Sequence, residues 1–553
     1  MPSLGSVSFA KSFRKFFNIL KLDKKDIVSI YIYAILAGLV QLSLPLGIQT
    51  IISFVMAGSI STSIVVLIIM VVIGTFFNGL LQIRQMQIIE KVEQKIFVRY
   101  SLAFSDQLPN LNIEKLDNYY LPELVNRFFD TTSLQKGLDK ILLDIPASLI
   151  QIFLGLILLS FYHPIFIGFG AVLLLIIILI IRFTSFQGLT TAMQASDYKY
   201  AIAAWLQEMA RVVKSFKYYK GTTLHMHKTD KLVGGYVDAR TNHFKILLTQ
   251  YWSLITFKIL ITAAMLIVGA ILLVNQQINI GQFIAADIVI ISIMASVEKL
   301  ISNLDKIYDA LTSVEKLSKI IDAEQEESGH LQLAVANKGV DIEFQNVHFT
   351  YPKGSKVLNN FSCQIPAGQV VHVAGSSGAG KSTMLRLLTG AYQNFSGNIM
   401  IDNVPIGNYL VGSIRSQTGI LLSQQDIFHG TLWENITMGN QSITVEQVME
   451  LGQIIGLQHF IQSNSMGFDV VLDPQGKRLP QKVVQNILLI RALLGKYRLL
   501  LLEEPFNHLS EDERNKVMLY IKKEKTATVI ITSTDSSISG YCDNVLYIKN
   551  NPQ

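Results

Sequence analysis

The sequence has little charge and almost no cysteine for its length. Only 16% of its 553 residues are Asp, Glu, Lys or Arg, whereas 50% are hydrophobic and the mean hydropathy is +0.38. This composition excludes an ordinary soluble protein and indicates an integral membrane protein. The only two cysteines, Cys363 and Cys542, exclude a disulfide scaffold and are typical of a cytosolic location. With 36 Gly and 13 Pro, the chain is neither collagen-like nor disordered.

Long apolar runs are confined to the part of the chain before residue 305. About 18 apolar residues are needed to cross a bilayer core about 30 Å thick. Six runs meet this requirement, and they lie at residues 27–56, 64–81, 141–162, 164–181, 257–274 and 278–297. The short connections at 57–63, around 163 and at 275–279 contain no Lys or Arg, whereas the other connections are rich in both. The positive-inside rule therefore predicts that both termini are cytosolic.

The first 26 residues combine basic and aromatic side chains. The apolar members recur at helical spacing between lysines and arginines, and they are Phe9, Phe13, Phe16, Phe17 and Leu20. This pattern predicts an amphipathic elbow helix over residues 1–26, lying on the inner membrane surface. A disordered basic tail is the alternative.

Residues 27–322 are expected to form a six-helix transmembrane domain. The segments between the second and third runs, and between the fourth and fifth, contain few Gly or Pro and are suited to helices that continue into the cytosol. Asp287 falls inside the sixth run, where a carboxylate facing lipid is costly. It should face a water-filled pathway or be protonated, and a structural hydrogen bond is an equal alternative. Lys258, near the cytosolic end of the fifth run, is expected to extend to the interface.

A charged, polar stretch at residues 323–340 marks a linker to a second domain at 341–553. Short β-branched runs in that domain alternate with helical patterns. The runs lie at residues 370–373, 419–422, 499–502 and 528–532. The alternation predicts an α/β fold with a largely parallel sheet.

The run at 370–373 leads into a glycine-rich loop and then a helical pattern, which is the context of a phosphate-binding loop. Its residues are Gly375, Ser376, Ser377, Gly378, Ala379, Gly380, Lys381, Ser382 and Thr383. Glycines allow backbone N–H groups and the helix N-terminus to surround phosphate oxygens. Lys381 is expected to reach the β- and γ-phosphates, and Ser382 to ligate Mg²⁺. The domain is therefore predicted to bind a nucleotide.

Six spans followed by one such domain resemble a half-transporter of the ATP-binding cassette exporter family, and the resemblance covers nearly the whole chain. It implies ATP and Mg²⁺ as cofactors. It also implies that Tyr351, about 24 residues before the loop, stacks on adenine, although a core tyrosine is the alternative. The segment 421–436 is similar to the family's Q-loop, whose glutamine contacts Mg²⁺. Gln424 is the preferred residue, and Gln425 is the alternative.

Residues 499–505 (LLLLEEP) resemble the family's Walker B strand, which usually ends in Asp-Glu. Here the first acid is Glu503, and its extra methylene is expected to loosen the hold on a metal that demands near-ideal octahedral geometry. Glu504 occupies the position of the general base that polarises the attacking water.

Three further positions depart from the family pattern. The signature loop, usually LSGGQ, reads LPQKV at residues 479–483. Pro480 has neither hydroxyl nor N–H, and Lys482 stands where glycine allows close approach to the γ-phosphate of the opposite subunit. Lys482 is expected to restore only some charge attraction. Thr534 replaces the switch histidine and Ser510 replaces the aspartate of the D-loop, whereas His508 is expected to be a surface histidine.

These departures beside an intact phosphate loop predict that ATP is held while hydrolysis is impaired. The resemblance implies a dimer with a second half-transporter, either a homodimer or, preferably, a heterodimer with a chain that carries an intact signature. The first functional hypothesis is an ATP-dependent exporter in the plasma (inner) membrane. The second is a hydrolysis-impaired regulatory or scaffold subunit.

The cargo is the least constrained part of the prediction. Residues 278–300 look like the last span of peptide and protein secretion exporters, which favours a peptide or protein cargo. A lipid or an amphipathic small molecule is the alternative. Membrane lipid and a periplasmic adaptor are further candidate partners, and nucleic acid is not expected.

Overall fold

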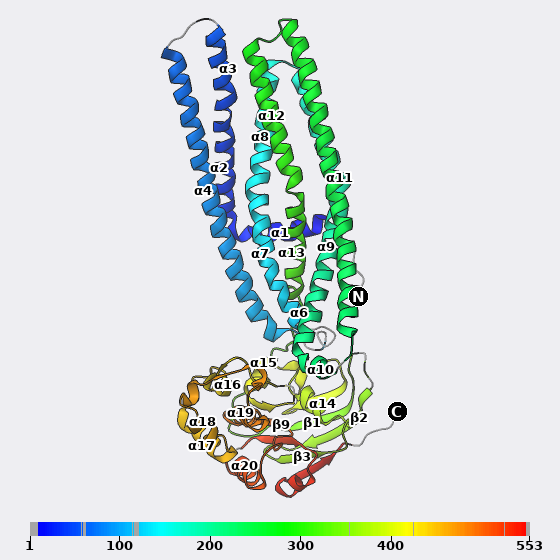
Figure 1. Cartoon of the computed structure of the whole chain (residues 1–553). Coiled ribbons are helices and arrows are strands. Elements are labelled where there is room, and N and C mark those ends of the chain that lie inside the picture. Colours follow the sequence, from blue (N-terminus) through cyan, green and yellow to red (C-terminus); the bar gives the residue numbers. More distant parts are fainter. Residues whose placement is uncertain are drawn as a thin grey trace. The chain divides into compact units, whose positions relative to one another are not determined.

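The computed structural model describes residues 9–56, 58, 62–112, 114, 121–219, 221–352, 354, 356–423, 425–524 and 526–548, with side chains for all of these except 9, 10, 183–186 and 524. Its internal contacts divide the chain into two compact units. The first comprises Met1–Pro109 and Tyr119–Ala323, and the second comprises Asn110–Asn118 and Glu324–Gln553. Figure 1 shows the helices of the first unit in blue to green and the mixed second unit in green to red.

In its described residues, the first unit consists of helices joined by short turns. Its α-helices are α1 (Phe9–Leu20), α2 (Lys24–Gln41), α3 (Ser43–Met56), α4 (Thr62–Gln107), α6 (Leu121–Asn126), α7 (Asp130–Asp139), α8 (Ile145–Tyr162), α9 (Ile165–Arg211), α10 (Val213–Tyr218), α11 (Leu224–Val274), α12 (Ile280–Ser302) and α13 (Leu304–Ile321). Six helical stretches in the described residues are long and apolar enough to cross a membrane. Each overlaps one of the six runs expected from the sequence. The chain is therefore a multi-pass membrane protein.

Three of these helices are much longer than a bilayer requires. Helices α4, α9 and α11 contain 46, 47 and 51 residues. At 1.5 Å per residue each extends roughly 70 Å, against a hydrocarbon core of about 30 Å. The excess is the helical extension that the polar connecting segments predict.

Two of the expected spans are interrupted, and a proline accounts for each interruption. The first run divides at Leu42 into α2 and α3, three residues before Pro45, whose missing N–H leaves the carbonyl of Gln41 without its helical donor. The third run begins with a π-helical turn, Lys140–Asp144, immediately before Pro146. The wider turn moves the carbonyl of residue i−4 away from the proline ring.

Only some of the apolar side chains of helix α1 are buried against the rest of the unit. Phe16 and Leu20 are buried within the unit, whereas Phe13 and Phe17 are 38% and 37% exposed. Lys15 forms an ion pair of 2.9 Å with Glu315 of α13. The helix is therefore fastened to the protein along one side and presents two phenyl rings along another.

The second unit is an α/β fold, as the alternating pattern predicts, and it contains an antiparallel sheet besides the expected parallel one. Its strands are β1 (Ile342–Thr350), β2 (Lys356–Ile365), β3 (Val370–Ala374), β4 (Ser396–Ile401), β5 (Val404–Pro405), β6 (Thr418–Leu421), β7 (Gly430–Thr431), β8 (Val471–Leu472), β9 (Leu499–Glu503), β10 (Thr528–Thr532) and β11 (Asn544–Tyr547). The parallel sheet has the order β11-β3-β10-β9-β6, and an antiparallel sheet has the order β2-β1-β4-β5. The sequence patterns singled out above locate four strands of the parallel sheet but none of the antiparallel one.

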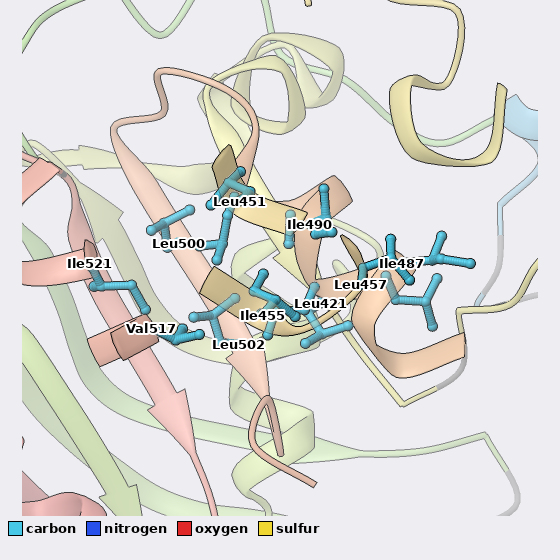
Figure 2. Close-up of a cluster of buried hydrophobic side chains, with 14 of the residues drawn as sticks. Leu421, Leu451, Ile455, Leu457, Ile487, Ile490, Leu500, Leu502, Val517 and Ile521 are labelled. Atoms are coloured by element: carbon cyan, nitrogen blue, oxygen red, sulfur yellow. The ribbon is translucent and has the colours of Figure 1, made fainter. Parts of the chain in front are cut away.

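Helices of this unit pack against one face of the parallel sheet, and a helix together with the antiparallel sheet packs against the other. The α-helices of the unit are α14 (Lys381–Leu388), α15 (Val411–Ser416), α16 (Leu432–Thr437), α17 (Val445–Ile455), α18 (Gln458–Ser463), α19 (Gln481–Leu493) and α20 (Glu511–Glu524). Every residue of β9 and β10 is buried, as expected for central strands of a covered parallel sheet. Figure 2 shows Leu500 and Leu502 of β9 among side chains from α17, α19 and α20. This core fixes the strand ends that carry the site.

Candidate nucleotide-binding site

The polar residues singled out in the second unit follow the carboxyl ends of adjacent parallel strands. The phosphate loop follows β3, Glu503 ends β9 and is followed by Glu504, and Ser533 and Thr534 follow β10. Because β3, β10, β9 and β6 are neighbours with the same direction, their carboxyl ends meet at one edge of the sheet. This edge is where open α/β sheets bind ligands.

The backbone of the loop after β3 needs glycine at its first position. Gly375 has φ +155°, and a Cβ there would lie 2.6 Å from the carbonyl oxygen of Ile548. Gly380, which directly precedes α14, has φ +100°. Side chains at these positions would be strained by sterics or by the left-handed backbone. The loop therefore leaves backbone N–H groups accessible at the N-terminus of α14.

Lys381 is the first residue of α14 and is only 9% exposed. Its Nζ donates to the carbonyl oxygens of Gly375 and Ser376, at 2.7 and 2.9 Å. These bonds hold the ammonium across the mouth of the loop. A phosphate oxygen bound in the loop would lie within reach of that charge.

Ser382 and Glu503 lie together, although they are 121 residues apart. The Ser382 hydroxyl donates to Glu503 Oε1 at 2.5 Å, and the backbone N–H of Ser423 donates to Oε2 at 2.8 Å. Glu503 is 8% exposed. A hydroxyl and a buried carboxylate, both oxygen donors beside a phosphate loop, fit the preference of Mg²⁺ for hard oxygen ligands. The extra methylene of Glu503 still allows contact with Ser382.

Glu504 is held by the segment that follows β10. The Ser533 hydroxyl donates to Glu504 Oε2 at 3.0 Å, and the N–H of Thr534 donates to Oε1 at 2.9 Å. Glu504 also has φ +45°, a left-handed conformation that costs a non-glycine residue about 1–2 kcal/mol. Both carboxylate oxygens therefore accept hydrogen bonds within the chain.

Ser533 was not predicted from the sequence, because the family pattern points to the neighbouring position, Thr534. Ser533 is itself supported from below by His372, a buried residue of β3, whose Nε2 lies 3.3 Å from the Ser533 carbonyl oxygen. His372 Nδ1 lies 2.9 Å from the hydroxyl of Ser539. The available signal was a histidine inside an otherwise apolar strand.

Tyr351 is half-buried beside α14. Its hydroxyl lies 3.2 Å from the Thr383 hydroxyl and accepts a hydrogen bond of 3.1 Å from Arg386. Its ring packs at a near-perpendicular angle against Phe349 and Tyr392. Tyr351 is thus tied to the helix that begins with Lys381, which places it beside the phosphate loop.

The preferred Q-loop residue, Gln424, lies outside the described residues. The alternative, Gln425, lies on a cavity of about 380 Å³ that Glu503, Glu504 and Gln481 also line. Its side chain accepts a hydrogen bond of 3.2 Å from the N–H of Leu422. His508 also lines this cavity and is exposed, as expected for a surface histidine.

The signature position is occupied by an ion pair within the chain. Pro480 precedes α19, and Lys482 in its first turn donates to both carboxylate oxygens of Glu513, at 2.8 Å each. Glu513 also accepts hydrogen bonds from the N–H and the hydroxyl of Ser510, at 2.8 and 2.9 Å. The Lys482 ammonium, expected from the sequence to restore some attraction for a phosphate, is thus already bound to a carboxylate.

Glu513 therefore connects the segment predicted to be the signature loop with the segment predicted to be the D-loop. Ser510, in place of the D-loop aspartate, precedes α20, and Glu513 lies in the first turn of that helix. Ser followed three residues later by Glu forms a reciprocal capping arrangement, because the Ser510 hydroxyl also accepts from the N–H of Glu513 at 3.3 Å.

Comparison with known proteins agrees with this reading of the two units. Residues 27–297 match the family model "ABC transporter transmembrane region", and residues 358–507 match the model "ABC transporter". The chain is 26% identical over 349 residues to the Alpha-hemolysin translocation ATP-binding protein HlyB of Escherichia coli O157:H7, which is 63% of this chain and 49% of that protein. It is 25% identical over 494 residues to a putative export ATP-binding/permease protein of Rickettsia bellii, which is 88% of this chain and 84% of that protein.

The fold also matches a solved structure, that of a bacterial Atm1-family ABC exporter with ATP bound. The TM-score is 0.85 at 18% sequence identity, over 95% of this chain and 93% of the other. The fold and the site define a membrane protein of six candidate spans joined to a P-loop nucleotide-binding unit. The two family models together cover most of the sequence, and the chain belongs to the ABC transporter family.

Proposed function

We propose that this chain is one half of an ATP-dependent exporter, with its nucleotide-binding unit and both termini in the cytosol and its spans in the plasma (inner) membrane. The observation that carries the proposal is the cluster at the carboxyl edge of the parallel sheet. There the Lys381 ammonium is hydrogen-bonded to the phosphate loop, and Ser382 and Glu503 form an oxygen-donor pair. The six candidate spans lie in the same polypeptide.

In this proposal ATP is bound with Mg²⁺ at that edge, and the bound metal supplies neutralisation of the phosphate charge. Lys381 and the loop N–H groups hold the phosphates. The Ser382 hydroxyl and the Glu503 carboxylate hold the metal, together with Gln424. Glu504 is the residue positioned to orient and deprotonate water, and Tyr351 is the residue that contacts adenine.

We further propose that the partner is a second half-transporter with an intact signature loop. The support lies in the contacts of Lys482. A homodimer would present LPQKV, with Lys482 paired to Glu513, to both nucleotides. A heterodimer would instead offer an intact signature to the ATP held at Lys381 of this chain. A peptide or protein is the favoured cargo, because one of the relatives, HlyB, is named for alpha-hemolysin translocation.

A second candidate function is a regulatory subunit that binds ATP without hydrolysing it. Its support is the hydrogen bonding of Glu504. One carboxylate oxygen accepts a hydrogen bond from Ser533 and the other accepts one from Thr534. A water molecule would have to compete with these two donors for the carboxylate.

One experiment separates the two functions. The assembled complex is purified with either wild-type chain or the Glu504→Gln variant, and ATP turnover and cargo movement are measured in proteoliposomes. Loss of turnover in the variant supports the exporter half with a competent site. Unchanged turnover supports the regulatory subunit. Lys516→Ala, a change at an exposed residue of α20, serves as the matched control.

A further inference from the structure

Asp287 is a carboxylate inside the sixth candidate span, on helix α12. It lies seven residues from Ile280, the first residue of the helix, which places it about 10 Å along the axis. The window that defines this span has a mean hydropathy of 2.0. An ionisable residue in such a place is expensive to maintain and is usually found where it has a partner.

The side of α12 that carries Asp287 faces helix α11. Residues 283, 287, 294 and 298 are separated by four, seven and four positions, so they form one stripe along the helix. Three members of the stripe contact α11. A Cβ built on Gly269 would lie 2.5 Å from the Phe283 ring, and the Thr262 hydroxyl donates to the sulfur of Met294 at 3.6 Å.

The third contact is an ion pair between Lys258 of α11 and Glu298, at 2.5 Å. The sequence predicted that Lys258 would extend to the interface, and its actual partner is this carboxylate. Glu298 is therefore neutralised from α11. Between Gly269 and Thr262, the part of α11 level with Asp287 contains Met265 and Leu266, which offer no charge and no donor.

Asp287 differs from the other members of its stripe. Among the described residues, no hydrogen bond or ion pair to its carboxylate is present. It is partly exposed rather than buried. The fully buried side of α12 is a different one, on which Val289 and Ile293 lie next to Gly155 of α8.

The surface beside Asp287 is apolar. Ile280 and Ile291, on the same side of α12, are 42% and 53% exposed. A single negative charge surrounded by exposed apolar side chains complements a ligand with one positive group and apolar flanks. A low-dielectric surrounding also strengthens the attraction between the charges.

We propose that Asp287 binds the cationic group of an amphipathic cargo. This inference rests on the proposed export function and adds a substrate class to it, namely molecules that carry a positive charge beside apolar groups. A basic amphipathic peptide and a small lipophilic cation share this chemistry.

The test measures binding rather than transport. The full chain, in its purified assembly, is placed in nanodiscs without ATP, and binding of tetraphenylphosphonium is compared with binding of tetraphenylborate, an anion of similar size and shape. Empty nanodiscs provide the background for both ions. The wild-type chain is expected to bind the cation saturably and to show no saturable binding of the anion.

The variants isolate the carboxylate. Asp287→Asn preserves size and removes the charge, and it is expected to weaken cation binding about tenfold or more. Asp287→Glu keeps the charge and is expected to retain binding. Glu298→Gln removes the other carboxylate of the stripe, which is already paired, and should leave binding within about twofold of wild type. Normal cation binding by Asp287→Asn, or an equal loss in Glu298→Gln, overturns the proposal.

Two additions complete the design. Lys381→Ala should bind the cation normally, so a failure of ATP-driven export does not affect this result. A ten-residue Leu/Lys peptide that displaces the cation, when a Leu/Glu peptide of equal length does not, assigns the site to peptide cargo. If Asp287-dependent cation binding persists and neither peptide displaces it, the site belongs to small lipophilic cations.

Discussion

Two parts of the nucleotide-binding unit differ in how closely they follow the family pattern. At the carboxyl edge of the sheet, Lys381, Ser382 and Glu503 remain arranged to hold phosphate and metal. At the start of α19, this chain has Lys482 where the family pattern has glycine, and the lysine is paired to Glu513. In our proposal, this chain keeps the surface that holds its own ATP and has lost the surface that would contact a partner's ATP.

The strongest prediction concerns the phosphate loop. Lys381→Ala removes a charge-assisted contact to the phosphates, and contacts of this kind are worth about 1.5–3 kcal/mol. Affinity for MgATP should therefore fall about 10- to 100-fold in equilibrium dialysis with the full chain. Lys516→Ala, at an exposed lysine, should bind as wild type does. Equal binding by both variants would remove Lys381 from the site.

The next effect concerns the metal. Glu503→Gln keeps the shape of the side chain but removes the charge that faces Ser382, so the gain in ATP affinity on adding Mg²⁺ should shrink about tenfold. Affinity in the presence of EDTA should change little. Glu511→Gln, at a residue whose side chain is 82% exposed, is the control. A loss that is equally large with and without Mg²⁺ would indicate a folding role instead.

A smaller effect is expected at the altered surface. Lys482→Ala breaks a partly exposed ion pair between α19 and α20 and should cost at most about 1 kcal/mol. Hydrogen exchange of the full chain should accelerate in the first turns of these two helices and not in β9 or β10. Unchanged exchange in α19 would show that the pair does not stabilise this region.

The same pair predicts a dependence on pH. Burial pushes the pKa of Glu513 up, but hydrogen bonds from Lys482 and Ser510 outweigh it and hold the pKa below its usual range. A lowered pKa contributes stability above the unfolded value of about 4.3, and this contribution disappears as the pH falls through the folded value. The difference in thermal stability between wild type and Lys482→Ala should be constant near pH 7 and should shrink below about pH 4. A difference that grows in acid would contradict this assignment.

The smallest effect sharpens the comparison most. A quadruple variant, Pro480→Ser with Gln481→Gly, Lys482→Gly and Val483→Gln, rebuilds the usual LSGGQ signature. Because we propose that this loop contacts the partner's nucleotide and not its own, the ATP affinity of this chain alone at low protein concentration should stay within about twofold of wild type. A tenfold change would mean that the loop contacts the ATP of its own chain.

The sequence predicts those features that depend on neighbouring residues. The phosphate loop is recognisable because the strand, the glycines and the helix start are contiguous, and the six apolar runs are visible for the same reason. The position of Pro45 also carries the signal for the break at Leu42, although a hydropathy scan reads residues 27–56 as one span.

Features made by distant residues escape the sequence. The contacts between Lys482 and Glu513, between Lys258 and Glu298, and between Ser533 and Glu504 join residues 29 to 40 positions apart on different elements. A charged side chain in the sequence has many conceivable partners, and only the packing of the elements selects one. The antiparallel sheet was not predicted for a related reason. Its strand β1 pairs with β2 and also with β4, which lies much further along the chain.

ATP turnover by the chain in the absence of any other subunit tests the central claim most directly. The purified full chain is reconstituted alone, and hydrolysis of saturating MgATP is compared between wild type and Glu504→Gln. The account predicts that both bind MgATP and that their rates are indistinguishable, because LPQKV faces each nucleotide in a self-paired assembly. A wild-type rate well above that of Glu504→Gln would show that this surface still completes a working site.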